Sequence, residues 1–277
     1  MGERYSRQSF LGEDAQRNIR RVRAGVVGLG GGGSHVVQQL AHIGFERYAL
    51  YDPDTVDRNG TNLNRLVGAV RRDAQDETPK TVVAERVIRG LLPAAEIDAH
   101  RLRWQEEPEP LRGCDVVVGC VDTFAERREL EAAMRRYLVP YIDVGMDVHV
   151  REGAPPRMVG QVILSMPGRP CMFCLGFLTE ERLAEEARRY GDLGERPQVV
   201  WPNGVLASAV VGIAVDLVTG WSGQGDRLVY LSYDGNSGCL GPHKRLEYVE
   251  DGACPHYPIS QTGDPVLRSV ESRLEAR

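Results

Sequence analysis

The stretch Ala24-Gly-Val-Val-Gly-Leu-Gly-Gly-Gly-Gly-Ser34 decides the fold of this 277-residue chain. An apolar run enters a glycine cluster and leaves through Ser34-His-Val-Val37, the pattern of a strand, a tight turn and a helix. Gly28, Gly30 and Gly33 fit the spacing G-x-G-x-x-G, in which missing side chains let backbone N–H groups approach a phosphate at the positive end of a helix. We therefore expect a nucleotide phosphate at this turn.

Asp52 follows Gly33 by 19 residues and ends the apolar run Tyr48-Ala-Leu-Tyr51. An acid at this distance commonly meets the hydroxyls of a ribose. Taken alone, the glycine motif is also compatible with a packing turn or with a site for NAD or FAD. Other residues must therefore identify the nucleotide.

Strand-like and helix-like segments alternate along the first half of the chain, which is typical of a parallel sheet covered on both faces. The predicted strands are Ala24–Gly28, Tyr48–Tyr51, Ile97–Leu102, Asp115–Cys120 and Tyr141–Val144, and the predicted helices are 34–43, 79–91 and 124–138. The pattern changes at Val159-Gly-Gln-Val-Ile-Leu-Ser165, which predicts the start of an antiparallel extension. We predict an α/β fold with a Rossmann-like, mostly parallel sheet that continues into one mixed sheet.

Further helices are expected at residues 4–22, in the charged segment after 179 and at Val205–Thr219, and a further strand at Leu228–Tyr233. The length permits one large domain or two small ones, and we favour one.

Composition argues against several classes of function. The net charge of −5 lacks the basic surplus of a protein that binds nucleic acid. The apolar stretches around 114–121 and 205–218 are too short or interrupted to predict a membrane span, and the first residues lack the apolar core of a signal peptide. A cytoplasmic protein is expected, in which the six cysteines are thiols or metal ligands.

Polar residues after the second strand favour a triphosphate. An NAD site needs one acid at the ribose, whereas Asp52-Pro-Asp54 and Asn62-Leu-Asn-Arg65 add further polar and cationic groups. Lys80 begins a predicted helix, where the helix dipole disfavours a cation unless an anion is bound nearby. The alternatives are a solvated loop for the first group and a plain surface lysine for the second.

Asp122 follows the apolar run Val116-Val-Val-Gly-Cys-Val121, at the expected carboxyl end of the sheet where ligands bind in open α/β folds. Magnesium prefers one or two carboxylates together with phosphate oxygens, so Asp122 is a candidate magnesium ligand. Its alternative role is a cap for the helix that begins after Thr123.

Cys171-Met-Phe-Cys174 has the spacing of half a tetrahedral zinc site. The second half could come from Cys254 and His256, since Tyr257 stands where a second C-x-x-C would place its cysteine. The alternative is that these thiols are reduced and buried, where they pack as small hydrophobic groups.

Together these motifs resemble the ubiquitin-activating (E1-like) superfamily, in particular its small bacterial ThiF/MoeB-type adenylyltransferases. The resemblance runs over about residues 4–257. It rests on Arg4-Tyr-Ser-Arg-Gln8, Gly28–Ser34, Asp52-x-Asp54, Asn62-Leu-Asn-Arg65, Lys80, Asp122 with Arg127, Gly160-Gln161, Cys171-x-x-Cys174, Asn203-Gly-Val-Leu206 and Tyr233-Asp-Gly235.

The resemblance implies ATP-dependent adenylation of a carboxylate, usually the C-terminal glycine of a ubiquitin-like or sulfur-carrier protein, with magnesium at Asp122 and structural zinc as an option. It implies a homodimer in which Arg7 reaches the phosphates of the neighbouring subunit. The implied catalytic residues are Arg7, Arg65, Lys80 and Asp122, and the implied nucleotide-binding residues are Gly28, Gly30, Gly31, Gly33, Asp52, Asp54, Asn62, Arg65 and Lys80.

The same resemblance divides the single adenylation domain of residues 1–277 into three parts. Residues 1–22 form a helical arm, 23–150 the nucleotide-binding half, and 151–277 the half that receives the protein substrate, with a crossover loop at about 175–202.

Two departures from the family pattern change the expectation. Arg58-Asn-Gly-Thr61 replaces a shorter link, which alters the loop around the nucleotide. Residues 175–202 contain no cysteine, and burial should suppress the reactivity of Cys114 and Cys120, so adenylation without thioester transfer is expected.

Three alternatives stay open from the sequence. They are activation of a small-molecule, peptide or tRNA-borne carboxylate, an NAD-dependent oxidoreductase, and a non-catalytic dimerisation partner.

Overall fold

The computed structural model describes residues 3–188, 197–225, 227–250, 252, 254–258 and 260. Its strands form one eight-stranded sheet in the order β3-β2-β1-β4-β5-β6-β7-β8. The strands are β1 (Arg23–Val27), β2 (Arg47–Tyr51), β3 (Glu96–His100), β4 (Val116–Gly119), β5 (Tyr141–Arg151), β6 (Ala154–Ser165), β7 (Val229–Asp234) and β8 (Cys239–Pro242).

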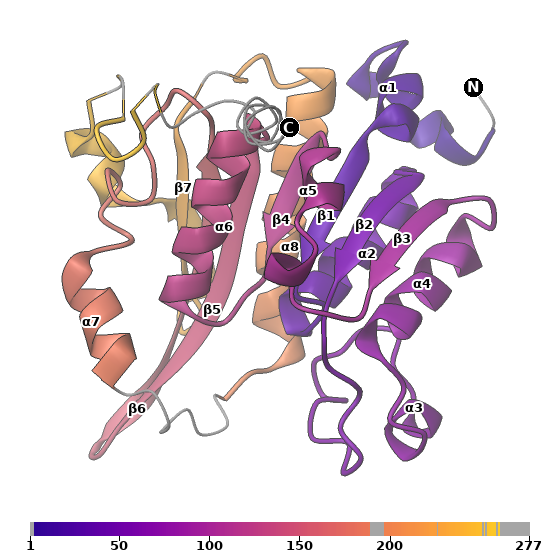
Figure 1. Cartoon of the computed structure of the whole chain (residues 1–277), viewed down its shortest axis with the longest axis horizontal. Coiled ribbons are helices and arrows are strands. Elements are labelled where there is room, and N and C mark those ends of the chain that lie inside the picture. Colours follow the sequence, from indigo (N-terminus) through magenta and orange to yellow (C-terminus); the bar gives the residue numbers. More distant parts are fainter. Residues whose placement is uncertain are drawn as a thin grey trace, which may run out of the picture.

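The sheet changes from parallel to antiparallel at β5. Strands β3, β2, β1, β4 and β5 are parallel, and β5 to β8 pair antiparallel. The predicted α/β fold with one mixed sheet is therefore confirmed (Figure 1).

Helices cover both faces of this sheet. The α-helices are α1 (Ala15–Arg21), α2 (Gly31–Ile43), α3 (Arg71–Gln75), α4 (Lys80–Leu91), α5 (Glu109–Arg112), α6 (Phe124–Tyr137), α7 (Glu180–Arg188) and α8 (Val200–Thr219), and the 3₁₀ helices are η1 (Glu3–Leu11), η2 (Trp104–Glu106) and η3 (Lys244–Tyr248). One core contains apolar side chains of α1, α2, α4 and α8, and a second contains those of α5, α6 and the segment 172–178 on the other face.

The N-terminal arm is broken rather than one continuous helix. The periodicity over 4–22 predicts a single helix, but η1 and α1 are separated at Gly12, whose φ of +111° belongs to the left-handed region. The arm therefore folds back on itself and packs at the carboxyl end of α2, where Gln8 Nε2 donates to the carbonyl of Ile43.

Strand β5 is much longer than the predicted Tyr141–Val144. It runs to Arg151 and forms a hairpin with β6 that projects beyond the sheet at the edge where β1 and β4 end (Figure 1). The projecting residues 145–158 carry charges, glycine and two prolines, so their sequence lacks the apolar signal of a buried strand.

Helix α8 begins at Val200, before the predicted Val205. Its length and composition are sufficient for a membrane span, with a mean hydropathy of 1.5, although 56% of that window is buried inside the fold. It runs beside α2 on one face of the sheet, and its buried side chains belong to the same core as those of α2. These contacts are typical of a core helix.

Candidate active site at the carboxyl ends of β1 and β4

The glycine loop lies at the point where the strand order of the sheet reverses, between the parallel strands β1 and β4. From β1 the chain passes through α2 on one face, and from β4 it passes through α6 on the other, the arrangement that in open α/β sheets leaves a ligand-binding crevice between the carboxyl ends of the two strands. Gly28 ends β1 on one side of this crevice, and Asp122 follows β4 on the other.

The glycines of the loop serve different purposes. Gly28 has a φ of +85°, and a Cβ there would lie 2.6 Å from the carbonyl oxygen of Cys120. A Cβ on Gly33 would overlap the carbonyl oxygen of Gly28. Gly30, by contrast, faces open space, since no atom lies within 4 Å of the position of its Cβ. Gly28 and Gly33 are therefore packing residues, and Gly30 borders the space available to a ligand.

Asp52 joins the glycine loop to Lys80. Its Oδ2 accepts the N–H of Leu29 at 2.7 Å, and its Oδ1 lies 3.5 Å from Lys80 Nζ. Lys80 Nζ also donates to Asp54 Oδ2 at 2.8 Å. Burial raises the pKa of Asp52 and would lower that of Lys80, but the two carboxylates outweigh burial and raise the pKa of Lys80. Lys80 is therefore held as a cation with 13% of its side chain exposed.

The Asn62–Arg65 segment is tied to the same loop. Ser34 Oγ on α2 accepts the N–H of Val67 at 3.1 Å. Asn62 is buried, and its Oδ1 accepts the N–H of Asp57 at 3.2 Å. Arg65 is partly exposed. The structure thus brings together the nucleotide-binding residues that the sequence predicts, and their roles stay predictions.

Asp122 is exposed beside the glycine loop, two residues after Cys120, whose carbonyl oxygen packs on Gly28. The cap of α6 is Thr123, whose side chain accepts the N–H of Glu126 at 3.1 Å. The alternative interpretation of Asp122 as the cap is therefore not supported. An exposed carboxylate at this edge fits the oxygen ligands that magnesium prefers.

A buried ion pair supports the turn that carries Asp122. Arg127 Nη1 contacts both carboxylate oxygens of Asp143, at 2.7 and 2.6 Å, and Arg127 Nη2 donates to the carbonyl of Val121 at 2.5 Å. Tyr141 and Gln161 also donate to Asp143. Asp143 is not among the site residues predicted from the sequence, although a charge inside the apolar run Tyr141–Val144 indicates a buried partner.

Arg7 is a predicted catalytic residue that the structure does not bring near the glycine loop of its own chain. It belongs to η1, which packs at the carboxyl end of α2, whereas the loop lies at the amino end of that helix. A helix of 13 residues is about 20 Å long. Arg7 therefore does not serve the site of its own chain.

Cys114 and Cys120 behave as expected for inert thiols. Burial raises the pKa of Cys114 to about 12 and raises that of Cys120 still further. Neither is a nucleophile near neutral pH.

A second cluster contains Cys171, Cys174, Cys254 and His256, whose four ligand atoms lie within 4.8 Å of one another. The Sγ atoms of Cys171 and Cys174 are 3.7 Å apart, as are those of Cys174 and Cys254, and His256 Nδ1 lies 3.5 and 3.4 Å from the first two. Tetrahedral zinc with its usual bond lengths gives sulfur–sulfur edges of about 3.8 Å and sulfur–nitrogen edges of about 3.5 Å. The donor set therefore fits zinc.

Tyr257 occupies the sequence position of a fourth cysteine and turns away from this cluster. Its hydroxyl donates to Glu131 Oε2 at 3.4 Å, and Glu131 Oε1 accepts the N–H of Met172 at 2.9 Å. Arg135 of α6 donates to the carbonyls of Arg169 and Pro170. These buried contacts fix the loop that carries Cys171 against α6.

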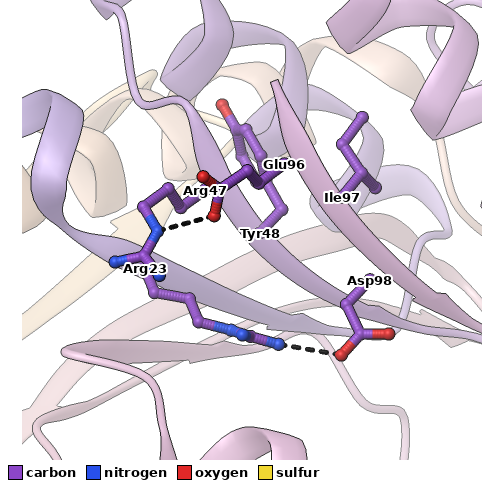
Figure 2. Close-up of a pocket in the computed structure, with 6 residues that line it drawn as sticks. All are labelled: Arg23, Arg47, Tyr48, Glu96, Ile97 and Asp98. Carbon is purple, nitrogen blue, oxygen red and sulfur yellow. Dashed lines mark hydrogen bonds and ion pairs between the residues drawn. The ribbon is translucent and has the colours of Figure 1, made fainter. Parts of the chain in front are cut away.

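A cavity of about 320 Å³ lies elsewhere on the molecule, at the amino ends of β1, β2 and β3 (Figure 2). Its charged side chains neutralise one another: Arg23 pairs with Asp98 at 2.8 Å and Arg47 with Glu96 at 3.0 Å. The lining contains none of the predicted site residues and lies at the opposite ends of the strands from the glycine loop. This cavity is separate from the candidate active site.

Three features together define a class of nucleotide-binding fold. They are a sheet that changes from parallel to antiparallel at β5, a glycine loop where the strand order reverses between β1 and β4, and a Cys/His cluster. Residues 4–246 match the ThiF family. The chain belongs to the ThiF family, which confirms the resemblance seen in the sequence.

Two named relatives each match about three fifths of the chain. The SAMP-activating enzyme E1 of Haloferax volcanii is 32% identical over 178 residues, covering 62% of this chain and 61% of the relative. The sulfur carrier protein adenylyltransferase of Thermus thermophilus is 34% identical over 184 residues, covering 62% and 63%. The chain thus spans about three fifths of the length of these relatives. Both names agree with the predicted class of enzyme.

A solved structure shares the fold. The crystal structure of E. coli MccB with succinimide superposes with a TM-score of 0.72 at 19% identity, covering 92% of this chain and 73% of MccB. This likeness extends over the nucleotide-binding half and the antiparallel extension alike.

Substitution of the glycines tests their division into packing and ligand positions. Gly33→Ala is expected to lower the free energy of unfolding by about 1–3 kcal/mol, because its methyl group overlaps the Gly28 carbonyl. Gly30→Ala should change it by less than about 1 kcal/mol and should weaken ATP binding, because its methyl group enters the ligand space. Denaturant titration and calorimetry measure both effects. Unchanged stability in Gly33→Ala, or unchanged ATP affinity in Gly30→Ala, would contradict the assignment.

Metal analysis tests the Cys/His cluster. The purified protein is expected to hold one zinc ion per chain, and Cys171→Ser should lose it because three ligands hold zinc poorly. Cys239→Ser is the control, since Cys239 is exposed on β8 away from the cluster. Zinc retained in Cys171→Ser, or missing from the unaltered protein, would remove the site.

Proposed function

We propose that the protein uses ATP to adenylate the C-terminal carboxylate of a ubiquitin-like or sulfur-carrier protein, giving an acyl-adenylate and pyrophosphate. The observation that carries the proposal is the junction of the glycine loop, Asp52 and Lys80 in one crevice. The names of the relatives, which include a sulfur carrier protein adenylyltransferase, support this choice of substrate.

The reaction forms one bond and breaks one. A carboxylate oxygen of the substrate attacks the α-phosphorus of ATP, the bond between this phosphorus and the bridging oxygen breaks, and pyrophosphate leaves with the electron pair. No proton has to move. The attacking carboxylate and the phosphates repel each other, so the chain must supply positive charge and alignment.

Several groups of this chain meet that need. The N–H groups at the start of α2, which has no side-chain cap, would bind phosphate oxygens. Lys80 is held by Asp52 and Asp54, and a bound phosphate would compete for its ammonium group. Arg65 and Asn62 would contact the nucleotide from the adjacent segment. Magnesium, held by Asp122 and phosphate oxygens, would neutralise charge on the leaving pyrophosphate.

The second half of the chain would receive the substrate. The β5–β6 hairpin projects from the same edge of the sheet as the glycine loop, and α7 with the following segment belongs to the predicted crossover loop at 175–202 (Figure 1). Residues 189–196 of that loop lie outside the described residues. Because the loop carries no cysteine, we propose adenylation without thioester transfer.

The alternative substrate is a small-molecule, peptide or tRNA-borne carboxylate, which uses the same chemistry. An NAD-dependent oxidoreductase would leave Lys80, Arg65 and Asp122 without a role.

A cytoplasmic location stays a prediction.

Exchange of labelled pyrophosphate into ATP tests the proposal. Exchange should require magnesium and a carrier protein that ends in a free glycine, and Asp122→Ala or Lys80→Ala should reduce it at least about 100-fold while the protein stays folded. Lys244→Ala, on η3 outside the crevice, is the control. Carriers with an amidated C-terminus must give no exchange. Exchange only with peptides or small acids would favour the alternative, and no exchange with any carboxylate would overturn the proposal.

We further propose that the active unit is a homodimer in which Arg7 serves the site of the partner subunit. Helix α8 runs from the glycine loop, where Asn203 packs on Gly31, to the arm, where Phe10 packs edge-on against Trp221 at 5.6 Å. Phe10 and Trp221 are 68% and 50% exposed. Trp201, Val205, Ser208 and Gly212 form an exposed, mostly apolar line along α8 at helical spacing.

Pairing of two such lines about a two-fold axis would place the arm of each subunit beside the glycine loop of the other. This arrangement explains why the arm lies about 20 Å from its own loop.

Mixed dimers test the exchange of arms. Arg7→Ala and Asp122→Ala should each be inactive alone, and mixing them should restore up to about one quarter of the activity, because a mixed dimer has one intact site. Sedimentation measures the dimer, and Trp201→Asp should produce monomers. A monomeric protein with full activity, or no recovery on mixing, would contradict the arrangement.

A further inference from the structure

A carboxylate from a distant part of the chain occupies the amino end of α6. Glu186 Oε1 accepts the N–H of Phe124 and Glu186 Oε2 accepts the N–H of Ala125, each at 2.9 Å. Glu186 lies on α7, in the predicted crossover loop. The first two amides of α6 are thus paired with a group from the half of the chain that would receive the substrate.

The next two amides of α6 are paired with Thr123. Its Oγ1 accepts the N–H of Glu126 and its carbonyl accepts the N–H of Arg127, both at 3.1 Å. Each of the first four amides of α6 therefore has an acceptor other than the Asp122 side chain. This pairing matters because aspartate is among the strongest helix caps, and the positive end of a helix attracts carboxylates.

Contacts of α7 fix Glu186 in this place. The guanidinium of Arg182 lies 5.6 Å from the ring centre of Phe124 and donates to the carbonyl of Phe177 at 2.7 Å. Leu183 is buried beneath the helix. Arg182 and Leu183, one turn before Glu186 on the same side of α7, therefore fix the helix that carries the Glu186 carboxylate.

The turn before α6 is anchored from the other direction. Arg127 donates to the carbonyl of Val121, so the residues on both sides of Asp122 are fixed. The Asp122 side chain itself remains exposed at the crevice. With the Glu186 cap in place, α6 does not use the Asp122 carboxylate as its cap.

We propose that Glu186 is a positioning residue that keeps the Asp122 carboxylate turned toward a nucleotide-bound divalent cation. This inference rests on the proposed function, because that function gives Asp122 its cation. When Glu186 is removed, the two released amides compete for Asp122, and the carboxylate turns toward α6.

Binding of Mn²⁺ in the presence of a non-hydrolysable ATP analogue, followed by electron paramagnetic resonance, tests the inference. Glu186→Ala should weaken Mn²⁺ binding about tenfold, and Glu186→Gln, which keeps an amide oxygen in place, should weaken it less. Glu180→Ala is the matched control, since Glu180 is exposed on the same helix. In an Asp122→Asn background, Glu186→Ala should have no further effect beyond about twofold.

Hydrogen exchange of residues 122–127 without nucleotide supplies an independent readout. Glu186→Ala alone should keep most of the protection, because Asp122 takes over the cap, and the Glu186→Ala, Asp122→Ala double variant, which has no acceptor at either position, should exchange about fivefold faster. The inference would be overturned if Glu186→Ala weakened Mn²⁺ binding, and accelerated hydrogen exchange, by the same factor whether or not Asp122 is also substituted. Full Mn²⁺ affinity in Asp122→Asn would instead overturn the metal role of Asp122 in the proposed function.

Discussion

The close approach of α2 to the turn after β1 is the constraint on which the rest of the site depends. Gly33 lies against the carbonyl of Gly28, and Gly28 against that of Cys120, so no side chain fits at either position. This contact brings the amino end of α2 next to the ends of β1 and β4. Because the strand order reverses there, one small region receives the helix amides, the acid after β2 that we expect at the ribose, and the acid after β4.

The charged side chains in this region are paired with one another, and the phosphates of a nucleotide would compete for the cation among them. Lys80 is neutralised by Asp52 and Asp54, and the Asp52 carboxylate is itself fixed by the N–H groups of Leu29 and Asp54. Beneath them, Arg127 and Asp143 form a buried pair whose remaining hydrogen bonds hold the turn before α6. A buried pair of this kind is costly to break, since removing one partner leaves an unpaired charge, and it therefore keeps the turn rigid.

Elements whose signals lie within a short stretch of sequence could be predicted. The apolar run and glycines at 24–34, the Asp52-x-Asp54 pair and Lys80 after Pro79 predicted both their elements and their neighbourhood. The spacing of Cys171 and Cys174 predicted half of a zinc site. The other half could not be settled from the sequence, because Cys254 and His256 meet this pair only through contacts over 80 or more residues. The full length of the β5–β6 hairpin escaped prediction, because after Val144 the continuous apolar run ends and polar residues, glycine and two prolines follow up to Arg157. Glu186 escaped it because nothing near α7 indicates that its partners are amides 62 and 61 residues away.

The central claim is that ATP, rather than a dinucleotide, occupies the glycine loop. Titration calorimetry of the whole protein with ATP and magnesium, and in parallel with NAD, tests it most directly. The account predicts one ATP bound per chain, with affinity lost in Lys80→Ala, and no binding of NAD. Stoichiometric binding of NAD without binding of ATP would contradict it.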